Sequence, residues 1–228
     1  MLSMGKKVSI LIIYVLGFLL LPAIFMIVGS QVLGLSGIYL VSVINFSTYL
    51  VLCGILLFLS RQVYIEDFKK INNWLKFFGF TMLGLLLTMS AVFLGNLILL
   101  LLGVTVQAAN QEATEAVLRA MPWLMIITAV IFGPIVEEII FRLVLMDLFK
   151  NSVISLLFSS LIFGLMHVMI GGWIHIITYA LAGLAFGGIY LIHRKNIWYV
   201  TILHIVHNAV AIGFVFLGQY LLEIYNSL

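Results

Sequence analysis

Two adjacent glutamates and an arginine lie inside an apolar stretch of this chain, "IFGPIVEEIIFRLVLMDLF", residues 131–149. A charged side chain at the centre of a bilayer costs about 3 kcal/mol on insertion scales. Glu138 and Arg142 are four residues apart, so on a helix they share a face and can form an ion pair. Glu137 is rotated by about 100° from Glu138 and is left to point elsewhere. The spacing predicts one buried ion pair and one carboxylate with a separate role. A purely structural use in helix packing is the alternative, but the second carboxylate adds nothing to packing.

Two later apolar stretches carry polar residues at the same four-residue spacing. Phe163 and His167 occur in "FGLMH", and His204 and Asn208 occur in "HIVHN". His207 lies three residues after His204, near the same helical face, and the pattern gives it no role. Polar side chains on one side of an apolar helix suggest a lined cavity. Interhelical hydrogen bonding alone, at about 0.6 kcal/mol per bond, is the alternative.

The elements that must position these residues are membrane-spanning helices. The chain has 228 residues, of which 64% are hydrophobic and 8% are charged, whereas soluble domains are about 25% charged. An all-α, polytopic transmembrane helical bundle is therefore expected. Seven apolar runs are each close to the roughly 20 residues that a span requires: 8–30, 36–59, 77–103, 122–148, 152–170, 173–192 and 197–222. A net charge of +3 with dispersed basic residues excludes a nucleic-acid partner.

The basic residues predict the orientation of the bundle. With the N-terminus inside, nine of the eleven basic residues fall on the cytoplasmic side. They are Lys6, Lys7, Arg61, Lys69, Lys70, Lys76, Lys150, Arg194 and Lys195. The N-terminus is therefore predicted to be cytoplasmic, and the basic segment 61–78 to lie along the inner interface, with a solvated loop as the alternative.

Helix geometry predicts where the polar side chains meet. At 1.5 Å per residue, the four polar positions of the three motifs lie about 11–22 Å from the inner ends of their spans, so they can converge. Asp147 is expected to pair with Lys150 near the inner end. Gly183 and Gly187 form a GxxxG pattern, which is expected to pack helices within the chain.

The three motifs together resemble those of a known family. "EEIIFR" fits EExxxR, "FGLMH" fits FxxxH and "HIVHN" fits HxxxN, in this order on successive apolar stretches. This arrangement resembles the CPBP family, also called the Abi family, which comprises CAAX prenyl endopeptidases and bacterial relatives linked to bacteriocin processing and immunity. The resemblance covers roughly residues 118–212. It divides the chain into scaffold helices, 1–117, and a CPBP-type catalytic membrane domain, 118–228.

The resemblance implies an intramembrane endopeptidase, a hydrolase. By the family's pattern, Glu137 and His167 activate a water, and His204 and Asn208 stabilise the oxyanion. Structural support is then the role of three further residues, Glu138, Arg142 and Phe163. We expect no metal cofactor, because Asn208 occupies an oxyanion-type position. The alternative is a catalytic Zn²⁺ held by Glu137, His167 and His204.

The resemblance also implies the partners and the location of the protein. A peptide or membrane-protein substrate and the lipid bilayer are the expected partners, in an integral membrane protein of the bacterial cell membrane. A non-proteolytic bacteriocin-immunity or peptide-binding membrane protein is the alternative function. A proton-coupled transporter would also use intramembrane Glu and His, but paired interrupted helices in the two halves are absent from the sequence.

Overall fold

The chain folds into a bundle of apolar helices. The structure is a computed structural model that describes residues 2–227. The helices are α1 (Met4–Ile27), α2 (Gly37–Lys69), α3 (Trp74–Leu101), α4 (Ala109–Ala120), α5 (Pro122–Ile126), α6 (Gly133–Glu138), α7 (Ser152–His167), α8 (Ile176–Ile192) and α9 (Ile197–Ser227). Helices satisfy every backbone polar group within one segment, which lipid requires. The predicted all-α transmembrane bundle is confirmed.

Six helical stretches are long and apolar enough to cross a membrane: Met4–Val32, Gly37–Lys69, Trp74–Leu101, Pro122–Asp147, Trp173–Ile192 and Ile197–Ser227. The predicted fifth span, 152–170, corresponds to the shorter apolar helix α7, Ser152–His167. Its 16 residues extend about 24 Å, less than the roughly 30 Å of the hydrocarbon core. Beyond it, Gly171 and Gly172 have positive φ and carry the chain into α8. His167 therefore lies at a helix end inside the bundle.

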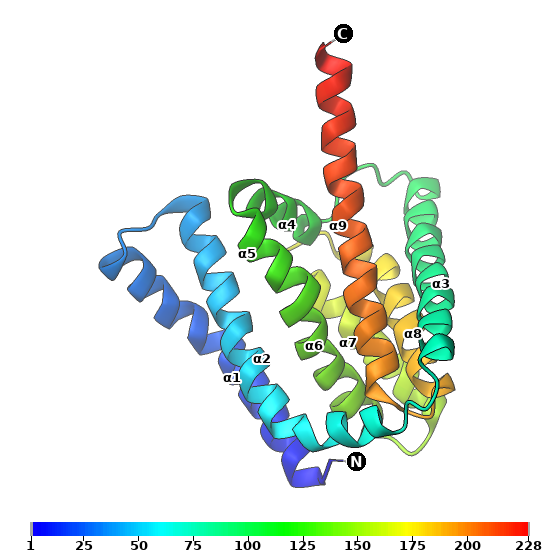
Figure 1. Cartoon of the computed structure of the whole chain (residues 1–228). Helices are drawn as coiled ribbons and strands as arrows, with labels where there is room; N and C mark the ends of the chain where they lie inside the picture. The colour runs from blue at the N-terminus through cyan, green and yellow to red at the C-terminus, as the bar shows by residue number, and fades with distance from the viewer. Residues whose placement is uncertain (1, 228) are drawn as a thin grey trace.

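The helix that carries the glutamates is the central one. In Figure 1, α6 lies between α2 and α9, α8 lies between α9 and α3, and the two termini lie at opposite ends of the bundle. In its most apolar window, the stretch Pro122–Asp147 has 56% of its residues buried, against 11% for Met4–Val32. The first helices therefore turn apolar side chains outward, and the polar residues of the fourth span are enclosed by protein.

The fourth span is not a regular helix, although the sequence predicts one. π-helical turns at Ile127–Phe132 and Ile139–Val144 flank α6, and a 3₁₀ turn, Leu145–Asp147, ends the span. Pro134 lies at the start of α6, where a missing backbone N–H is tolerated best. π-turns inside α-helices occur mostly at functional sites. Both glutamates thus occupy a short α-helical segment between two widened turns.

The GxxxG pattern packs helices within the chain, as predicted. A Cβ added at Gly183 would lie 3.1 Å from Ser160 Cα, and one added at Gly187 would clash with the Leu156 side chain. Both neighbours belong to α7, so the small residues of α8 allow α7 to approach closely.

The predicted pair between Asp147 and Lys150 is wrong. Asp147 instead binds Lys7, at 2.7 Å, and Lys195, at 3.3 Å. The helical turn ends at Asp147, so a residue three positions later is not held on the same face. Asp147 thereby joins the start of α1 to the connection between α8 and α9.

Candidate active site

Three helices bring the predicted carboxylates and histidines together. Glu137 lies on α6, His167 is the last residue of α7, and His204 lies on α9. Glu137 Oε2 is 4.0 Å from His167 Nε2 and 3.8 Å from His204 Nε2. Side chains that are 30 and 67 positions apart in the sequence thus converge on one carboxylate oxygen.

The second glutamate belongs to a buried network. Arg142 Nε donates to Glu138 Oε2 at 2.8 Å, and neither side chain is exposed. Arg142 Nη1 donates to Ser159 Oγ at 3.3 Å, which links the pair to α7. His204 Nδ1 lies 2.7 Å from Glu138 Oε1. The predicted ion pair forms, and Glu138 also orients His204.

Glu137 differs from Glu138 in its access to the site. The Glu137 side chain is 15% exposed and the His167 side chain 19% exposed, whereas Glu138 is fully enclosed. Glu137 can therefore meet a water or a substrate, and Glu138 cannot. The adjacent carboxylates have different environments because successive helical positions point in different directions.

The hydrogen bonds assign the protons on both imidazole rings. His204 Nδ1 faces a carboxylate and His167 Nδ1 faces the Phe163 carbonyl at 2.8 Å, so each Nδ1 donates. In a neutral ring the Nε2 atom is then an acceptor. Both Nε2 atoms are directed at Glu137 Oε2, which is buried without a hydrogen-bond partner among residues 2–227. Three acceptors therefore face one another, and a hydrogen-bond donor is needed between them.

A water molecule suits this spacing better than a zinc ion. Atoms 3.8–4.0 Å apart can each lie about 2.8 Å from one shared water. Tetrahedral zinc ligands, at about 2.1 Å from the metal, lie only about 3.4 Å apart. Within residues 2–227, no group of three or more His, Cys, Asp or Glu side chains has an arrangement that could hold a metal. The expectation of a metal-free site stays a prediction.

Aromatic rings hold the two imidazoles in place. The His167 ring lies 4.3 Å from Phe163 and is stacked at 4.7 Å on Tyr179. The His204 ring is stacked at 4.3 Å on Phe186. Tyr179 and Phe186 both come from α8 and were missed by the sequence analysis, because an aromatic residue in an apolar span carries no distinguishing signal. Phe163 also packs on Phe141, at 5.0 Å, close to the ion pair.

The scaffold half forms one wall of the site. A Cβ added at Gly133 would lie 3.7 Å from Glu137 Oε1 and 3.8 Å from Tyr49 Cε1. The glycine therefore leaves room for the ring of Tyr49, from α2, close to the carboxylate. The sequence analysis assigned no site residue to this half of the chain.

The remaining polar residues of α9 have separate contacts. Asn208 Nδ2 donates to the Ala129 carbonyl, in the first π-turn, at 2.8 Å. One amide hydrogen of Asn208 remains for another acceptor. His207 Nδ1 is 2.9 Å from Thr88 Oγ1 on α3, and its ring meets the edge of Phe186. His207 therefore joins α9 to α3 and contacts the ring that supports His204.

Comparisons with known proteins agree with the motifs. Residues 119–210 match the family described as "Type II CAAX prenyl endopeptidase Rce1-like". The "Putative membrane peptidase YdiL" of Bacillus subtilis (strain 168) is 35% identical over 109 residues, which cover 46% of this chain and 43% of that protein. An uncharacterised protein of Mycoplasma capricolum is 30% identical over 98 residues, which cover 43% of this chain and 29% of that protein.

The "UPF0177 protein YajF" of Lactococcus lactis is 28% identical over 172 residues, covering 56% of this chain and 85% of that protein. The chain spans less than half the length of the Bacillus and Mycoplasma relatives. No solved structure matches it. The family match includes all three motifs and every site residue that the sequence analysis predicted. Residues 119–210 of this chain are therefore similar to the Rce1-like family of type II CAAX prenyl endopeptidases.

Proposed function

We propose that this protein is an intramembrane endopeptidase in which Glu137 activates a water molecule. One observation carries the proposal: the buried Glu137 Oε2, which has no hydrogen-bond partner among residues 2–227, faces the Nε2 atoms of His204 and His167 at 3.8 and 4.0 Å. A water placed there donates one hydrogen to Glu137 and the other to His167. Its oxygen lone pairs are then directed away from both acceptors, toward the carbonyl carbon of a bound peptide.

The reaction follows from these positions. The water oxygen bonds to the carbonyl carbon while one water proton passes to Glu137, and the carbonyl π electrons move to the oxygen as an oxyanion. The oxyanion then re-forms the carbonyl, the C–N bond breaks, and the departing nitrogen takes the proton from Glu137. The products are a carboxylic acid and an amine, and Glu137 returns to its starting form. His167 orients the water, since its ring is fixed by the Phe163 carbonyl and by Tyr179.

Stabilisation of the oxyanion requires a proton on His204 Nε2. The Glu138 carboxylate, at 2.7 Å from Nδ1, fixes the orientation of that ring, as a buried carboxylate does behind a catalytic imidazole. With His204 protonated, the cluster contains two negative groups, Glu137 and Glu138, and two positive ones, His204 and Arg142. Such a cluster has no net charge, which lowers the cost of its burial. The free amide hydrogen of Asn208 is the second proposed donor.

The substrate is proposed to be a peptide or a membrane protein that is cut close to the bilayer. The family description names a prenyl endopeptidase and the Bacillus relative is named a membrane peptidase, and both descriptions fit cleavage at a site surrounded by apolar helices. The proposed location is the bacterial cell membrane, since the relatives reported above come from bacteria.

The test is cleavage by the purified full-length protein in lipid nanodiscs. Peptides with and without a prenylated cysteine near the C-terminus are incubated in H₂¹⁸O, and products are identified by mass spectrometry. One ¹⁸O atom is expected in each new carboxyl group. Glu137→Gln is expected to lower the rate by about 10²–10⁴-fold, with unchanged folded yield because the side chain is not part of the buried ion pair. The matched control is Glu112→Gln, which changes an exposed residue of α4. Binding of a peptide without cleavage by the wild-type protein would favour the peptide-binding alternative.

A further inference from the structure

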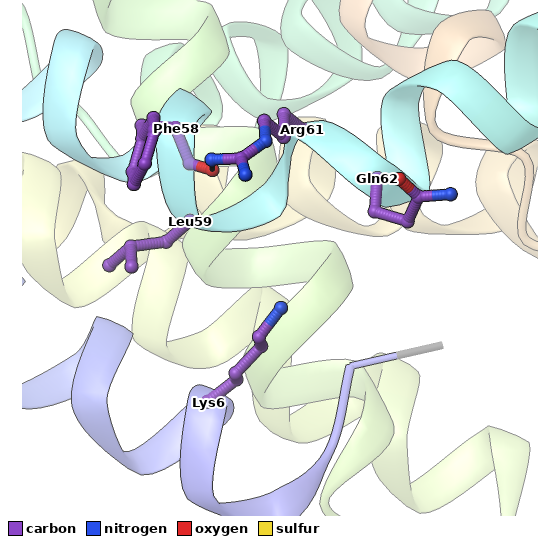
Figure 2. Close-up of a pocket in the computed structure, with 5 residues that line it drawn as sticks. All are labelled: Lys6, Phe58, Leu59, Arg61 and Gln62. Carbon is purple, nitrogen blue, oxygen red and sulfur yellow. Dashed lines mark hydrogen bonds between the residues drawn. The ribbon is translucent and has the colours of Figure 1, made fainter.

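A second site lies at the end of the bundle where α1 begins. A cleft of about 340 Å³ between α1 and α2 is lined by Lys6, Phe58, Leu59, Arg61 and Gln62. Figure 2 shows Lys6 reaching up from α1 toward the turn of α2 that carries the other four residues. The motifs and the proposed reaction make no use of these side chains.

The cleft lies where α2 changes direction. In Figure 1 the last turns of α2 run across the lower end of the bundle, beside the start of α1. Ser60 is buried and its hydroxyl donates to the Leu56 carbonyl at 2.7 Å, a bond that often bends helices. The residues before Ser60 are mostly apolar, and Arg61 follows Ser60 directly. The cleft therefore combines an apolar wall with a polar mouth.

The cleft is positively charged. Within residues 2–227, neither Lys6 nor Arg61 forms an ion pair with a carboxylate. The Arg61 guanidinium is held over the Phe58 ring, at 4.1 Å from its centroid, and donates to the Phe58 carbonyl. Glu66 is engaged by the Gln62 amide at 3.1 Å. The charges of Lys6 and Arg61 thus face the same cleft, and no carboxylate among residues 2–227 neutralises them.

We propose that this cleft binds the headgroup of an anionic phospholipid. The cations match a phosphodiester, and the guanidinium presents paired donors that suit phosphate oxygens. Phe58 is 63% exposed, and the outward faces of α1 and α2 next to it are apolar at Val8, Ile12 and Ile55. Acyl chains can lie along these faces while the headgroup occupies the cleft. Free phosphate would interact with the two basic side chains but not with the apolar surface beside Phe58. A phospholipid interacts with both, so it is the occupant that we propose.

The experiment measures binding of dioctanoyl phosphatidylglycerol to the full-length protein in a neutral detergent. Dioctanoyl phosphatidylcholine and inorganic phosphate are the comparison ligands. Each basic residue near a lipid headgroup contributes about fivefold in affinity, so the Lys6→Ala/Arg61→Ala variant is expected to bind phosphatidylglycerol about thirtyfold more weakly. The matched control, Lys69→Ala/Lys76→Ala, removes the same charge from exposed positions outside the cleft and is expected to lose less than about threefold. Phe58→Ala removes both the apolar wall and the ring that holds Arg61, and it is expected to weaken lipid binding.

Three outcomes would overturn the proposal. If the two double variants lost the same affinity for phosphatidylglycerol, the basic residues would attract the lipid through their overall charge and not through this cleft. Phosphate binding as tight as phosphatidylglycerol binding, and lost on Lys6→Ala/Arg61→Ala, would identify a simple anion site. Equal binding of phosphatidylcholine would exclude recognition of charge. Thermal unfolding of every variant serves as the check that the fold is retained, which we expect because the cleft residues are exposed or half-buried.

Discussion

Removal of Arg142 tests whether the Glu138–Arg142 pair is essential to the fold. The change Arg142→Met keeps an unbranched apolar chain and deletes the bond from Nε to Glu138, at 2.8 Å, and the bond to Ser159, at 3.3 Å. Glu138 is then left fully buried with His204 as its remaining partner. Breaking a buried pair by removing one partner costs about 3–5 kcal/mol. For a chain of this size, that corresponds to an unfolding midpoint about 6–20 °C lower.

The assay is thermal unfolding in detergent, followed by circular dichroism, together with the yield of folded protein. Arg119→Met is the matched control, because Arg119 and Glu115 have the same four-residue spacing at 3.7 Å on an exposed helix face. An exposed pair contributes about 0–1 kcal/mol, so this variant is expected to unfold within about 4 °C of wild type.

A double variant, Glu138→Gln/Arg142→Met, separates the lost pair from the uncompensated charge. It removes both charges, so it is expected to recover more than half of the stability lost by Arg142→Met. If Arg142→Met unfolds no earlier than Arg119→Met, or if the double variant is less stable than Arg142→Met, the inferred role of the pair is wrong.

Two further predictions concern helix packing and metal content. Gly187→Ala is expected to lower the free energy of unfolding by about 1–3 kcal/mol, because the added methyl group would clash with Leu156 and lie 3.2 Å from Arg142 Nη1. The control is Gly188→Ala, where nothing lies within 4 Å of the added methyl group. Equal thermal midpoints for the two variants would contradict this packing. Elemental analysis of the active protein is expected to find far less than one zinc per chain, and chelators should leave the cleavage rate unchanged. The zinc mechanism would be required instead if the protein contained one zinc per chain and if His204→Ala lost both the zinc and the activity.

Local spacing and composition are enough to predict several features of this protein. Few charges among many apolar residues required helices, since lipid offers backbone groups no other partner. The four-residue spacing of Glu138 and Arg142 placed both on one face, and the ion pair forms as expected. The three motifs, in their order, were also sufficient to predict the family that the match over residues 119–210 confirms.

Features within single helices were less predictable where the helix is irregular. The two π-turns around α6 have no sequence signal comparable to a proline or a cap. The short α7 looked like a full span because its apolar composition continues past His167. Its end depends on the glycine turn at residues 171–172 and on the packing of α7 against α8.

Which side chains meet depends on how the helices pack against one another in three dimensions. Lys7 and Lys195 reach Asp147 from opposite ends of the chain, whereas the neighbouring Lys150 does not. The stacking of Tyr179 on His167, and of Phe186 on His204, places α8 behind the two imidazole rings, and Tyr49 from α2 lies on another side of the candidate site. Helical spacing fixes which residues share a face of one helix. The rotation and depth of each helix relative to its neighbours come from side-chain packing over the whole bundle, and these decide that two imidazoles face Glu137 and one faces Glu138.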